Sequence, residues 1–368
     1  MRKLPVGCSQ YLLAAVIALG VNAQAADRPA PAAGARIATI RIPGQPLSSF
    51  DIGFVDQRGT YAFSDRAHKS LDLIDAASDR FIGRVGGFTG FDRAAGFGRA
   101  GPNGVVAVGG HEFWAGNGDS TLKVVDLRSR SIIASIPTGG RKRVDEMTYD
   151  GRDHLVIAVN NADEPPFVSF VSTRSRRVVG KLVLARATDG AEQPAWDPAT
   201  GLVYLSIPVL DHVKANGAVA VIDPRAHRLE KLFPVHACMP AGLAVGPNGH
   251  LLVGCSDDAV AAGFAPKSLI LAARTGKIVA TIHAVGGSDE VWYEPKTHRY
   301  YLAASGFPGG PVLGVVDALS DRWLGNLPTG PNAHSVAADP RTGRVFVPIQ
   351  GGAPSGACRS GCVAVFAP

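Results

Sequence analysis

The feature that most constrains this chain is a unit of two predicted strands that recurs along its length. In the clearest copy, residues 288–295 give a polar start and an apolar strand, and residues 299–304 give a second strand after a turn. Related copies lie at residues 144–150, 192–198, 239–245 and 333–340. Such recurrence indicates a repeat architecture, in which each copy buries its apolar face against its neighbours.

Each copy contains further predicted strands. In the second copy they lie at residues 105–108, 112–115, 121–126 and 131–136. These runs are short and β-branched, and turn formers such as Asn117-Gly118-Asp119 separate them, which is typical of strands. No amphipathic helical pattern persists for three turns after the N-terminal segment. We therefore expect an all-β fold. The third strand often ends in an acid that we expect to cap its own turn: Asp75, Asp126, Asp223 and Asp317.

The number and spacing of the copies predict the architecture. First strands begin near residues 49, 102, 145, 192, 240, 289 and 334, which matches the period of a four-stranded β-propeller blade. The last copy has only three clear strands, but an alternating strand at residues 36–42 precedes the first copy. We expect this strand to become the outer edge of the last blade, because closing the ring removes an unpaired edge. The prediction is one seven-bladed propeller domain over residues 35–368.

The first residues are predicted to lie outside this domain. Arg2 and Lys3 give a positive start, and residues 11–21 form an apolar core that is too short to cross a bilayer. Ala23-Gln24-Ala25 fits the small-residue rule for cleavage. We therefore predict a signal peptide at residues 1–25, a flexible leader at residues 26–34 and a periplasmic or secreted protein. The alternative is an uncleaved membrane anchor.

Charge argues against a nucleic-acid partner. The formal net charge is +6, and no block of like charge is longer than Arg141-Lys142-Arg143, which has no aromatic residues within it. Such a block is typical of a solvated loop rather than a nucleic-acid surface. We expect no nucleic acid, no membrane span after cleavage of the signal peptide, and a monomer.

The cysteines predict disulfides. Without Cys8 the chain has four, an even number that suggests disulfides in an exported protein. Cys238 and Cys255 bracket one predicted hairpin, and Cys358 and Cys362 close a small loop. Of the three possible connectivities we favour Cys238–Cys255 with Cys358–Cys362; the alternative is free, buried thiols. A zinc site is not indicated, because the cysteines have neither the spacing nor the accompanying histidine pair.

Residues 116–127, together with residues 132–139, resemble the YVTN-type propeller repeat, which has a polar turn, a valine-rich strand and a final Ala-Thr-Ile-like strand. Residues 277–282 are similar. The resemblance covers essentially the whole mature chain and implies a propeller; its relatives include surface-layer and periplasmic proteins, lactonase-type enzymes and haem-bearing nitrite reductases. No Cys-x-x-Cys-His haem motif and no nucleotide-binding motif occurs here.

Propeller geometry selects the candidate site. The first strand of each blade lines the central channel, so all first strands start at one mouth, and the second strands end on the same face. The candidate ligand-binding residues at these positions are Asp51, Asn103, Asp145, Glu146, Asn160, Glu192, Asp289, Glu290 and His334. The same positions also hold Asp65, Asn117, Asn161, Gln193, Asp257 and Asp258. Because side chains alternate along a strand, one member of each adjacent acidic pair is expected to point inward.

Several carboxylates at one narrow opening repel one another. They can bind a cation, take raised pKa values, or pair with basic neighbours such as Arg66, His68 and Arg143. Carboxylates with asparagine carbonyls suit a hard cation, so we expect Ca²⁺ or Mg²⁺ as the possible cofactor. The alternative is that these residues cap strands and solvate a water-filled channel.

Two further features bear on chemistry. His334 is the only histidine at a first-strand start, and beside a carboxylate it can act as a general base, which makes it the one catalytic candidate. The glycine-rich residues 86–101 contain Phe88, Phe91 and Phe97 and form a long insertion on the same face, which we interpret as a flexible lid over the mouth. The aromatic residues within first strands, Trp196, Trp292 and Tyr293, are expected to pack between blades.

The sequence thus predicts an exported propeller that binds a small ligand, together with a divalent cation, at an acidic channel mouth. One alternative is a metal-dependent lactonase or related hydrolase that uses the same mouth, although no Gly-x-Ser-x-Gly nucleophile motif occurs. Residues of the types that such an enzyme uses as metal ligands are Glu146, Asn160, Glu192 and Asp289. Another alternative is a protein-binding scaffold whose contact surface is the face with long loops.

Overall fold

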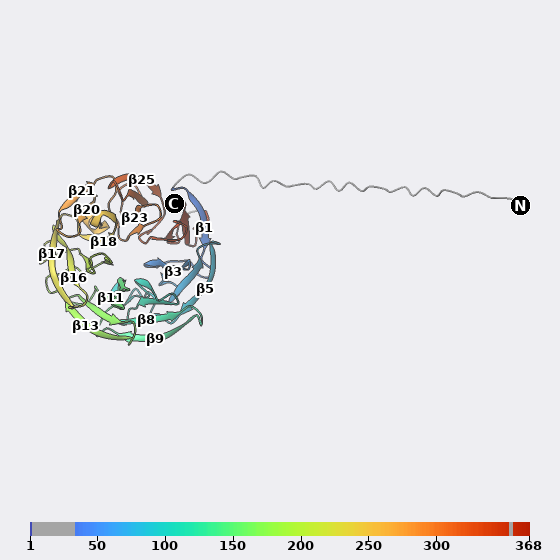
Figure 1. The fold of residues 1–368 in the computed structure, drawn as a ribbon, viewed down its shortest axis with the longest axis horizontal. Coiled ribbons are helices and arrows are strands. Elements are labelled where there is room, and N and C mark those ends of the chain that lie inside the picture. The colour runs from blue at the N-terminus through green and yellow to red at the C-terminus, as the bar shows by residue number, and fades with distance from the viewer. Residues whose placement is uncertain (2–33, 353–355) are drawn as a thin grey trace. The chain divides into compact units, whose positions relative to one another are not determined.

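Seven antiparallel sheets of four strands each form a ring, as Figure 1 shows. The structure is a computed structural model that describes Met1 and residues 34–352 and 356–368. Among these residues the helical segments are α1 (Asp257–Ala261) and two 3₁₀ turns (Phe97–Arg99 and Pro247–Gly249). The predicted all-β, seven-bladed propeller is confirmed.

The first three blades follow one another along the chain. Blade one contains β2 (Gly53–Val55), β3 (Thr60–Asp65), β4 (Ser70–Asp75) and β5 (Arg80–Gly86). Blade two contains β6 (Val105–Val108), β7 (Glu112–Gly116), β8 (Thr121–Asp126) and β9 (Ser131–Pro137). Blade three contains β10 (Met147–Asp150), β11 (Leu155–Asn160), β12 (Phe167–Ser172) and β13 (Arg177–Val183).

The next three blades repeat this order. Blade four contains β14 (Pro194–Trp196), β15 (Val203–Ile207), β16 (Asn216–Asp223) and β17 (Arg228–His236). Blade five contains β18 (Pro240–Val245), β19 (His250–Cys255), β20 (Ser268–Ala272) and β21 (Ile278–Ile282). Blade six contains β22 (Val291–Glu294), β23 (Arg299–Ala304), β24 (Val312–Asp317) and β25 (Arg322–Pro328).

The seventh blade joins the two ends of the described chain. It contains β26 (Ala337–Ala338), β27 (Val345–Ile349), β28 (Cys362–Phe366) and, at its outer edge, β1 (Arg36–Arg41). β1 pairs antiparallel with β28, with Ile40 opposite Val363. Figure 1 shows this closure as the blue β1 beside the red end of the chain. The predicted closing strand is therefore confirmed, and its pairing leaves β28 without a free edge.

The core lies between blades. One apolar cluster joins Trp114 and Val124 of blade two to Val156 of blade three, and each of these side chains is fully buried. The outer strands alternate instead: β9 and β13 expose every second residue along most of their length. Side chains alternate between the two faces of a strand, so an outer strand with one face exposed to solvent shows this period-two pattern. The predicted capping is also present, since Asp75 and Asp317 accept hydrogen bonds from the backbone N–H of Ser78 and Ser320.

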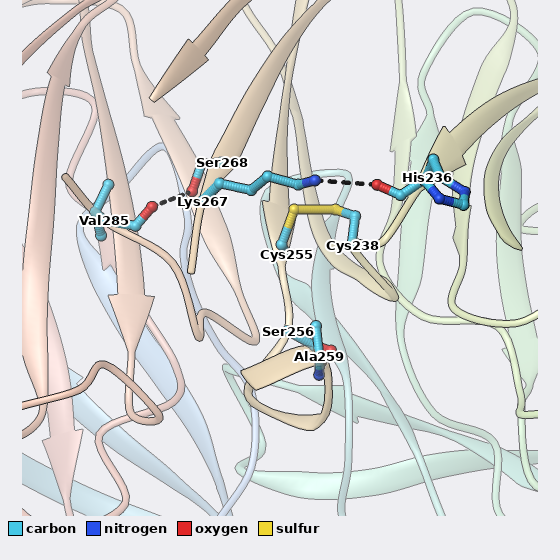
Figure 2. Close-up of a disulfide and its surroundings, with 8 residues drawn as sticks. All are labelled: His236, Cys238, Cys255, Ser256, Ala259, Lys267, Ser268 and Val285. Atoms are coloured by element: carbon cyan, nitrogen blue, oxygen red, sulfur yellow. Dashed lines mark hydrogen bonds between the residues drawn. A yellow bond between two sulfur atoms is a disulfide. The ribbon is translucent and has the colours of Figure 1, made fainter. Parts of the chain in front are cut away.

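Both predicted disulfides are present. Cys238 and Cys255 bridge the two sides of the β18–β19 hairpin, with their Cα atoms 4.5 Å apart, and both are buried (Figure 2). Cys358 and Cys362 close the loop that leads into β28, with their Cα atoms 4.9 Å apart. One bridge thus fixes the first two strands of blade five, and the other fixes the start of the strand that closes the ring.

The N-terminal predictions fall largely outside the described residues. The signal peptide at residues 1–25, except Met1, and the leader at residues 26–34, except Gly34, lie there. The described residues from Gly34 to Pro368 belong to one compact unit. Within the described part of the chain, no helix has the length and apolar character needed to cross a membrane.

Candidate functional site

The mouth of the channel holds a cavity of about 890 Å³. We call this the upper cavity. Its wall includes six of the predicted site residues: Asp51, Asp145, Glu146, Glu192, Asp289 and His334. The fold brings the acids together for a simple reason. The backbone N–H groups of Asp51, Asp145, Glu192 and Asp289 each donate to the second strand of their own blade, so the four residues occupy equivalent places around the ring.

The predicted residues Asn103, Asn160 and Glu290 do not line the upper cavity. Asn103 is fully buried, and its side-chain N–H₂ group donates to the carbonyls of Ala100 and Val144 at 2.9 and 2.7 Å. It therefore joins the second blade to the third. Asn160 is also fully buried, and its Nδ2 donates to Ser120 Oγ at 3.0 Å. These two asparagines support the wall rather than facing a ligand.

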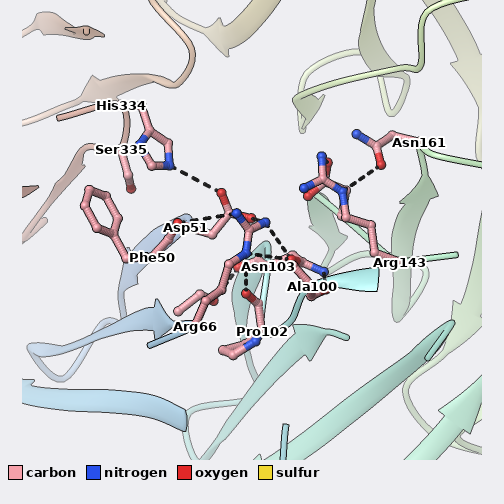
Figure 3. Close-up of polar contacts among 12 residues, drawn as sticks. Phe50, Asp51, Arg66, Ala100, Pro102, Asn103, Arg143, Asn161, His334 and Ser335 are labelled. Atoms are coloured by element: carbon pink, nitrogen blue, oxygen red, sulfur yellow. Dashed lines mark hydrogen bonds and ion pairs between the residues drawn. The ribbon is translucent and has the colours of Figure 1, made fainter. Parts of the chain in front are cut away.

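A buried arginine organises one side of the upper cavity. Arg66, at the end of β3, is 4% exposed and forms an ion pair with Asp51 (Figure 3). Its guanidinium also donates to Asn103 Oδ1 at 2.6 Å from Nη2. Burial opposes ionisation of Asp51, but the charge of Arg66 and the hydrogen bond with His334 outweigh it and hold the pKa of Asp51 below its usual value. This pair is internally neutral, and the hydrogen bond from Arg66 to Asn103 links blade one to blade two.

A second ion pair lines the same cavity. Arg143 Nη2 is 2.6 Å from Asp145 Oδ2. The Nε of Arg143 donates to Asn161 Oδ1 at 3.1 Å, as Figure 3 shows. Burial raises the pKa of Asp145, although Arg143 works against that shift. The salt-bridge alternative drawn from the sequence is thus realised for Arg66 and Arg143. His68 instead pairs with Asp65, with 2.6 Å between Nδ1 and Oδ2, and does not line the upper cavity.

His334 is held between acceptors. Its Nδ1 lies 2.8 Å from the carbonyl of Asn332, its Nε2 lies 3.4 Å from Asp51 Oδ1, and its ring stacks on Phe50 at 4.7 Å. Two acceptors are best satisfied when both ring nitrogens carry protons. Burial lowers the pKa of His334, but the hydrogen bond to Asp51 and the charge of Asp289 raise it above the usual value. This setting favours a charged imidazolium at neutral pH over a free general base.

Three acids of the upper cavity remain without a cationic partner. Among the described residues, Glu146, Glu192 and Asp289 form no ion pair with arginine, lysine or histidine. Burial, with the charges of Glu290 and Asp289, raises the pKa of Glu146 well above its usual value. Burial and the charge of Asp145 do the same for Glu192. Burial and neighbouring acids such as Asp257 raise the pKa of Asp289 to about 7, although His334 opposes the shift.

Below these acids the channel continues as a smaller, lower cavity of about 260 Å³. Ile52 and Glu146 line both cavities. Glu290 lines the lower cavity only and is 1% exposed; its Oε2 accepts hydrogen bonds from Ser335 Oγ at 2.7 Å and from the N–H of Val336 at 2.9 Å. The burial that surrounds it raises the pKa of Glu290 well above its usual value.

The aromatic residues of the first strands also face this lower cavity. Trp196, Trp292 and Tyr293 line it, and each also packs partly against apolar clusters between blades. They are half-buried rather than fully enclosed. The sequence therefore predicted their packing role, and it missed that the same rings form a wall of the channel.

The glycine-rich insertion lies at the upper cavity. Phe91, Arg93 and Phe97 line that cavity, and the rings of Phe91 and Phe97 stack at 4.5 Å. The base of the insertion is tied, because the backbones of Gly90 and Gly101 exchange two hydrogen bonds. Phe88 differs from the other two phenylalanines: it is 6% exposed and belongs to the core between blades one and two. The insertion is placed where a lid would be, with two of its three aromatic rings at the mouth.

Sequence reasoning missed some of the wall. Asp189 and Arg93 line the upper cavity but lie in loops rather than at the start of a strand. The nearest signal is proximity, since Asp189 comes three residues before Glu192. Asp257 and Asp258 were not missed: they follow the second strand β19, as predicted, and they line the upper cavity at the start of the short α1. The full wall carries eight carboxylates against three arginines and one histidine, so its balance is acidic.

Metal ligation requires closer convergence than this wall provides. Within the described parts of the chain, no group of three or more His, Cys, Asp or Glu side chains is arranged to hold a metal ion. The acids at the mouth surround a volume rather than a point. The arrangement can attract a positively charged group, because ionised carboxylates and a nearby cation stabilise one another.

Comparisons with known proteins identify the fold. No protein-family model matches the chain, and no curated protein matches it in sequence. A chain of Kuenenia stuttgartiensis hydrazine synthase is similar, with a TM-score of 0.67, 14% identity, and coverage of 85% of this chain and 96% of that chain. A chain of the mitotic checkpoint complex is similar with a TM-score of 0.68, 14% identity, and coverage of 94% and 98%. At this identity the likeness shows the propeller fold alone.

Proposed function

We propose that this propeller binds a small, positively charged organic ligand in the upper cavity. The observation that carries the proposal is the set of three carboxyl groups, on Glu146, Glu192 and Asp289, that face the cavity without a cationic partner among the described residues. The two arginines nearest to them are already paired with Asp51 and Asp145. A protonated amine supplies the missing positive charge.

The surroundings favour an organic cation. The wall has an excess of acids although the whole chain carries a formal charge of +6, so the mouth contrasts with the rest of the molecule. An acidic cleft with low-dielectric walls concentrates cations. Phe91 and Phe97 stand at its edge, and aromatic faces attract ammonium groups by about 0.5–1 kcal/mol at exposed sites.

The proposal carries a proton linkage. Glu146, Glu192 and Asp289 have raised pKa values, so part of this set holds protons at neutral pH in the free protein. A bound cation stabilises the ionised carboxylates and drives those protons off. Affinity for the cation therefore rises with pH through the region near 7, where Asp289 titrates.

The other functions expected from the sequence remain predictions. A divalent cation or a metal-dependent lactonase needs several ligands on one ion, and the described side chains do not provide such a group. A scaffold role is compatible with the propeller fold. Export to the periplasm or outside the cell is part of our proposal, supported by two disulfides, which persist in oxidising compartments.

Calorimetric titration with hexylamine, hexanol and hexanoate tests the proposed function. We expect hexylamine to bind and the neutral and anionic analogues to bind at least tenfold more weakly. Glu192→Gln weakens hexylamine binding, whereas Glu230→Gln, the same change on the exposed outer strand β17, leaves it unchanged. Equal binding of all three probes, or no effect of Glu192→Gln, contradicts the proposal. Titration with Ca²⁺ and Mg²⁺, with and without chelator, tests the metal alternative in the same samples.

A further inference from the structure

The upper and lower cavities adjoin along the channel and have two different walls; we call the two together the passage. Ile52 and Glu146 line both cavities, so the two spaces meet at these residues. We propose that the ligand is a cationic amphiphile, whose ammonium head binds among the carboxyl groups of the upper cavity and whose apolar tail enters the lower cavity. This inference rests on the proposed function and specifies the chemical class of its ligand.

The wall of the lower cavity fits an apolar tail. It is lined by the side chains of Phe54, Trp196, Trp292 and Tyr293, together with aliphatic residues such as Leu243. The ring of Phe54 meets that of Trp292 edge to face at 5.1 Å, which leaves the two rings as adjoining walls. All four aromatic side chains are half-buried, so the ring of blades does not enclose them completely. A tail that covers them removes apolar surface from water.

Glu146 sits where head and tail meet. It is 6% exposed, and its side chain makes no hydrogen bond or ion pair with the described residues, yet it lines both cavities. A carboxyl group buried to this degree is normally paired. Glu290, deeper in the passage, differs because Ser335 and Val336 already donate to it. The unpartnered Glu146 is therefore the carboxyl group that best receives an ammonium whose tail points downward.

Charge complementarity decides between an amphiphile and other occupants. An inorganic ion occupies only the upper cavity and leaves the aromatic wall of the lower cavity in contact with water. A neutral apolar molecule fills the lower level and leaves Glu146, Glu192 and Asp289 unpaired. Only a molecule with both parts satisfies both walls of the passage.

A homologous series tests this inference. Calorimetry with propylamine, butylamine, pentylamine and hexylamine is expected to show affinity that rises about fourfold for each methylene that enters the lower cavity. Trp292→Leu reduces this dependence on chain length without abolishing binding of propylamine. The matched control is Trp323→Leu, which changes an exposed tryptophan on the outer strand β25 and leaves the series unchanged.

A second measurement keeps the test valid if Trp292→Leu folds poorly. An ω-bromoalkylamine carries a heavy atom at the end of its tail and quenches nearby indole fluorescence in the unmodified protein. We expect quenching that saturates with binding, and we expect Trp323→Leu to retain it. Quenching that does not saturate with binding shows that the tail stays away from Trp196 and Trp292.

The outcomes separate the two proposals. If all amines bind equally well and no quenching occurs, the amphiphile is wrong while the cation site stands. If the matching alcohols bind as tightly as the amines and show the same rise with chain length, the head has no role and the inference is overturned. If no amine binds at all, the proposed function fails and this inference fails with it.

Discussion

The two halves of the channel are built from the same strands but present opposite chemistry. At the upper end, the starts of the first strands supply Asp51, Asp145, Glu192 and Asp289. Only a few residues further along the same strands, the wall becomes Phe54, Trp196 and Trp292. The backbone pairing of the repeat is equivalent in both halves, and the side chains alone distinguish them.

The difference indicates which residues of each blade are free to vary: those that face the channel rather than a neighbouring blade. The middle of each blade is fixed by packing between neighbours, as shown by the fully buried Trp114 and Val156. The inner strands are free of that constraint on the side facing the channel. Their residues therefore vary from blade to blade, with acids in some blades and small residues such as Ala241 in another. The channel-facing side chains that differ between blades are therefore the ones that bear on function.

The largest expected effect on stability comes from breaking the ion pair between Arg66 and Asp51 in the upper cavity. Arg66→Met leaves Asp51 buried without its main cationic partner, and breaking such a buried pair costs about 3–5 kcal/mol of unfolding free energy. Urea unfolding measures this loss. Adding Asp51→Asn recovers part of it, and Arg93→Met, an exposed arginine of the same cavity, costs less than about 0.5 kcal/mol. A small effect of Arg66→Met means that the mouth does not depend on this pair.

The pH dependence of stability comes next and separates the acidic half from the apolar half. The pKa of Asp289 is about 7 in the folded protein against an ordinary value of 3.8, so between these values the folded state holds a proton that the unfolded chain has released. Stability therefore falls as pH rises from about 4 to about 7, by up to about 1.4 kcal/mol per unit for this group.

Urea unfolding of Asp289→Asn across that range checks the slope. We expect the variant to show a flatter fall in stability with pH than the unmodified protein. Gln350→Ala, which changes a residue of the same cavity that carries no titratable group, serves as the control and keeps the original slope. Identical slopes for Asp289→Asn and the unmodified protein refute the raised pKa, and an increase of stability with pH in this range does so as well.

Glu146→Gln tests the role of the carboxyl group that lines both cavities. Burial raises the pKa of Glu146 well above its usual value, and glutamine resembles the neutral carboxyl group in shape and charge. The substitution is therefore expected to change the unfolding free energy by less than about 0.5 kcal/mol. Hexylamine binding at neutral pH weakens at least tenfold, because a hydrogen bond to a charged group contributes about 1.5–3 kcal/mol. Calorimetry and urea unfolding give both quantities. Loss of stability without loss of binding assigns Glu146 to the scaffold instead.

The smallest expected effect concerns the insertion above the mouth. Phe97 is 57% exposed, so Phe97→Ala leaves stability nearly unchanged but weakens hexylamine binding about two- to fivefold through loss of one aromatic face. Leu324→Ala, an exposed apolar residue of β25, is the control that leaves binding unchanged. An unchanged affinity in Phe97→Ala removes the insertion from the site.

Much of the fold could be predicted from the sequence because period-two alternation and turn chemistry act locally. The strands of blade two, the closing role of residues 36–41 and the two disulfides all depend on pairing between elements whose neighbours the repeat defines. The convergence of acids at the mouth could be predicted for the same reason: equivalent positions of a closed ring face one opening.

The partners of those acids could not be predicted, because they depend on contacts between blades. Arg66 pairs with Asp51 of its own blade, and its guanidinium also donates to Asn103 of the next blade, a contact that the repeat does not define. Asn160 turns toward Ser120 rather than the channel, although its position in the repeat is suitable. Asp189 lies in a loop, for which the repeat gives no position. The choice between paired and unpaired carboxyl groups is tertiary information, and it is the choice on which function depends.

The most direct test of the central claim is the number of protons released when a cation binds to the upper half. Hexylamine titration at pH 7 in buffers of different ionisation enthalpy measures this number. We predict net proton release on binding, less release in Glu146→Gln and in Asp289→Asn, and unchanged release in Glu230→Gln. Binding without any proton release, or equal release in all of these variants, contradicts a site made of unpaired, protonated carboxyl groups.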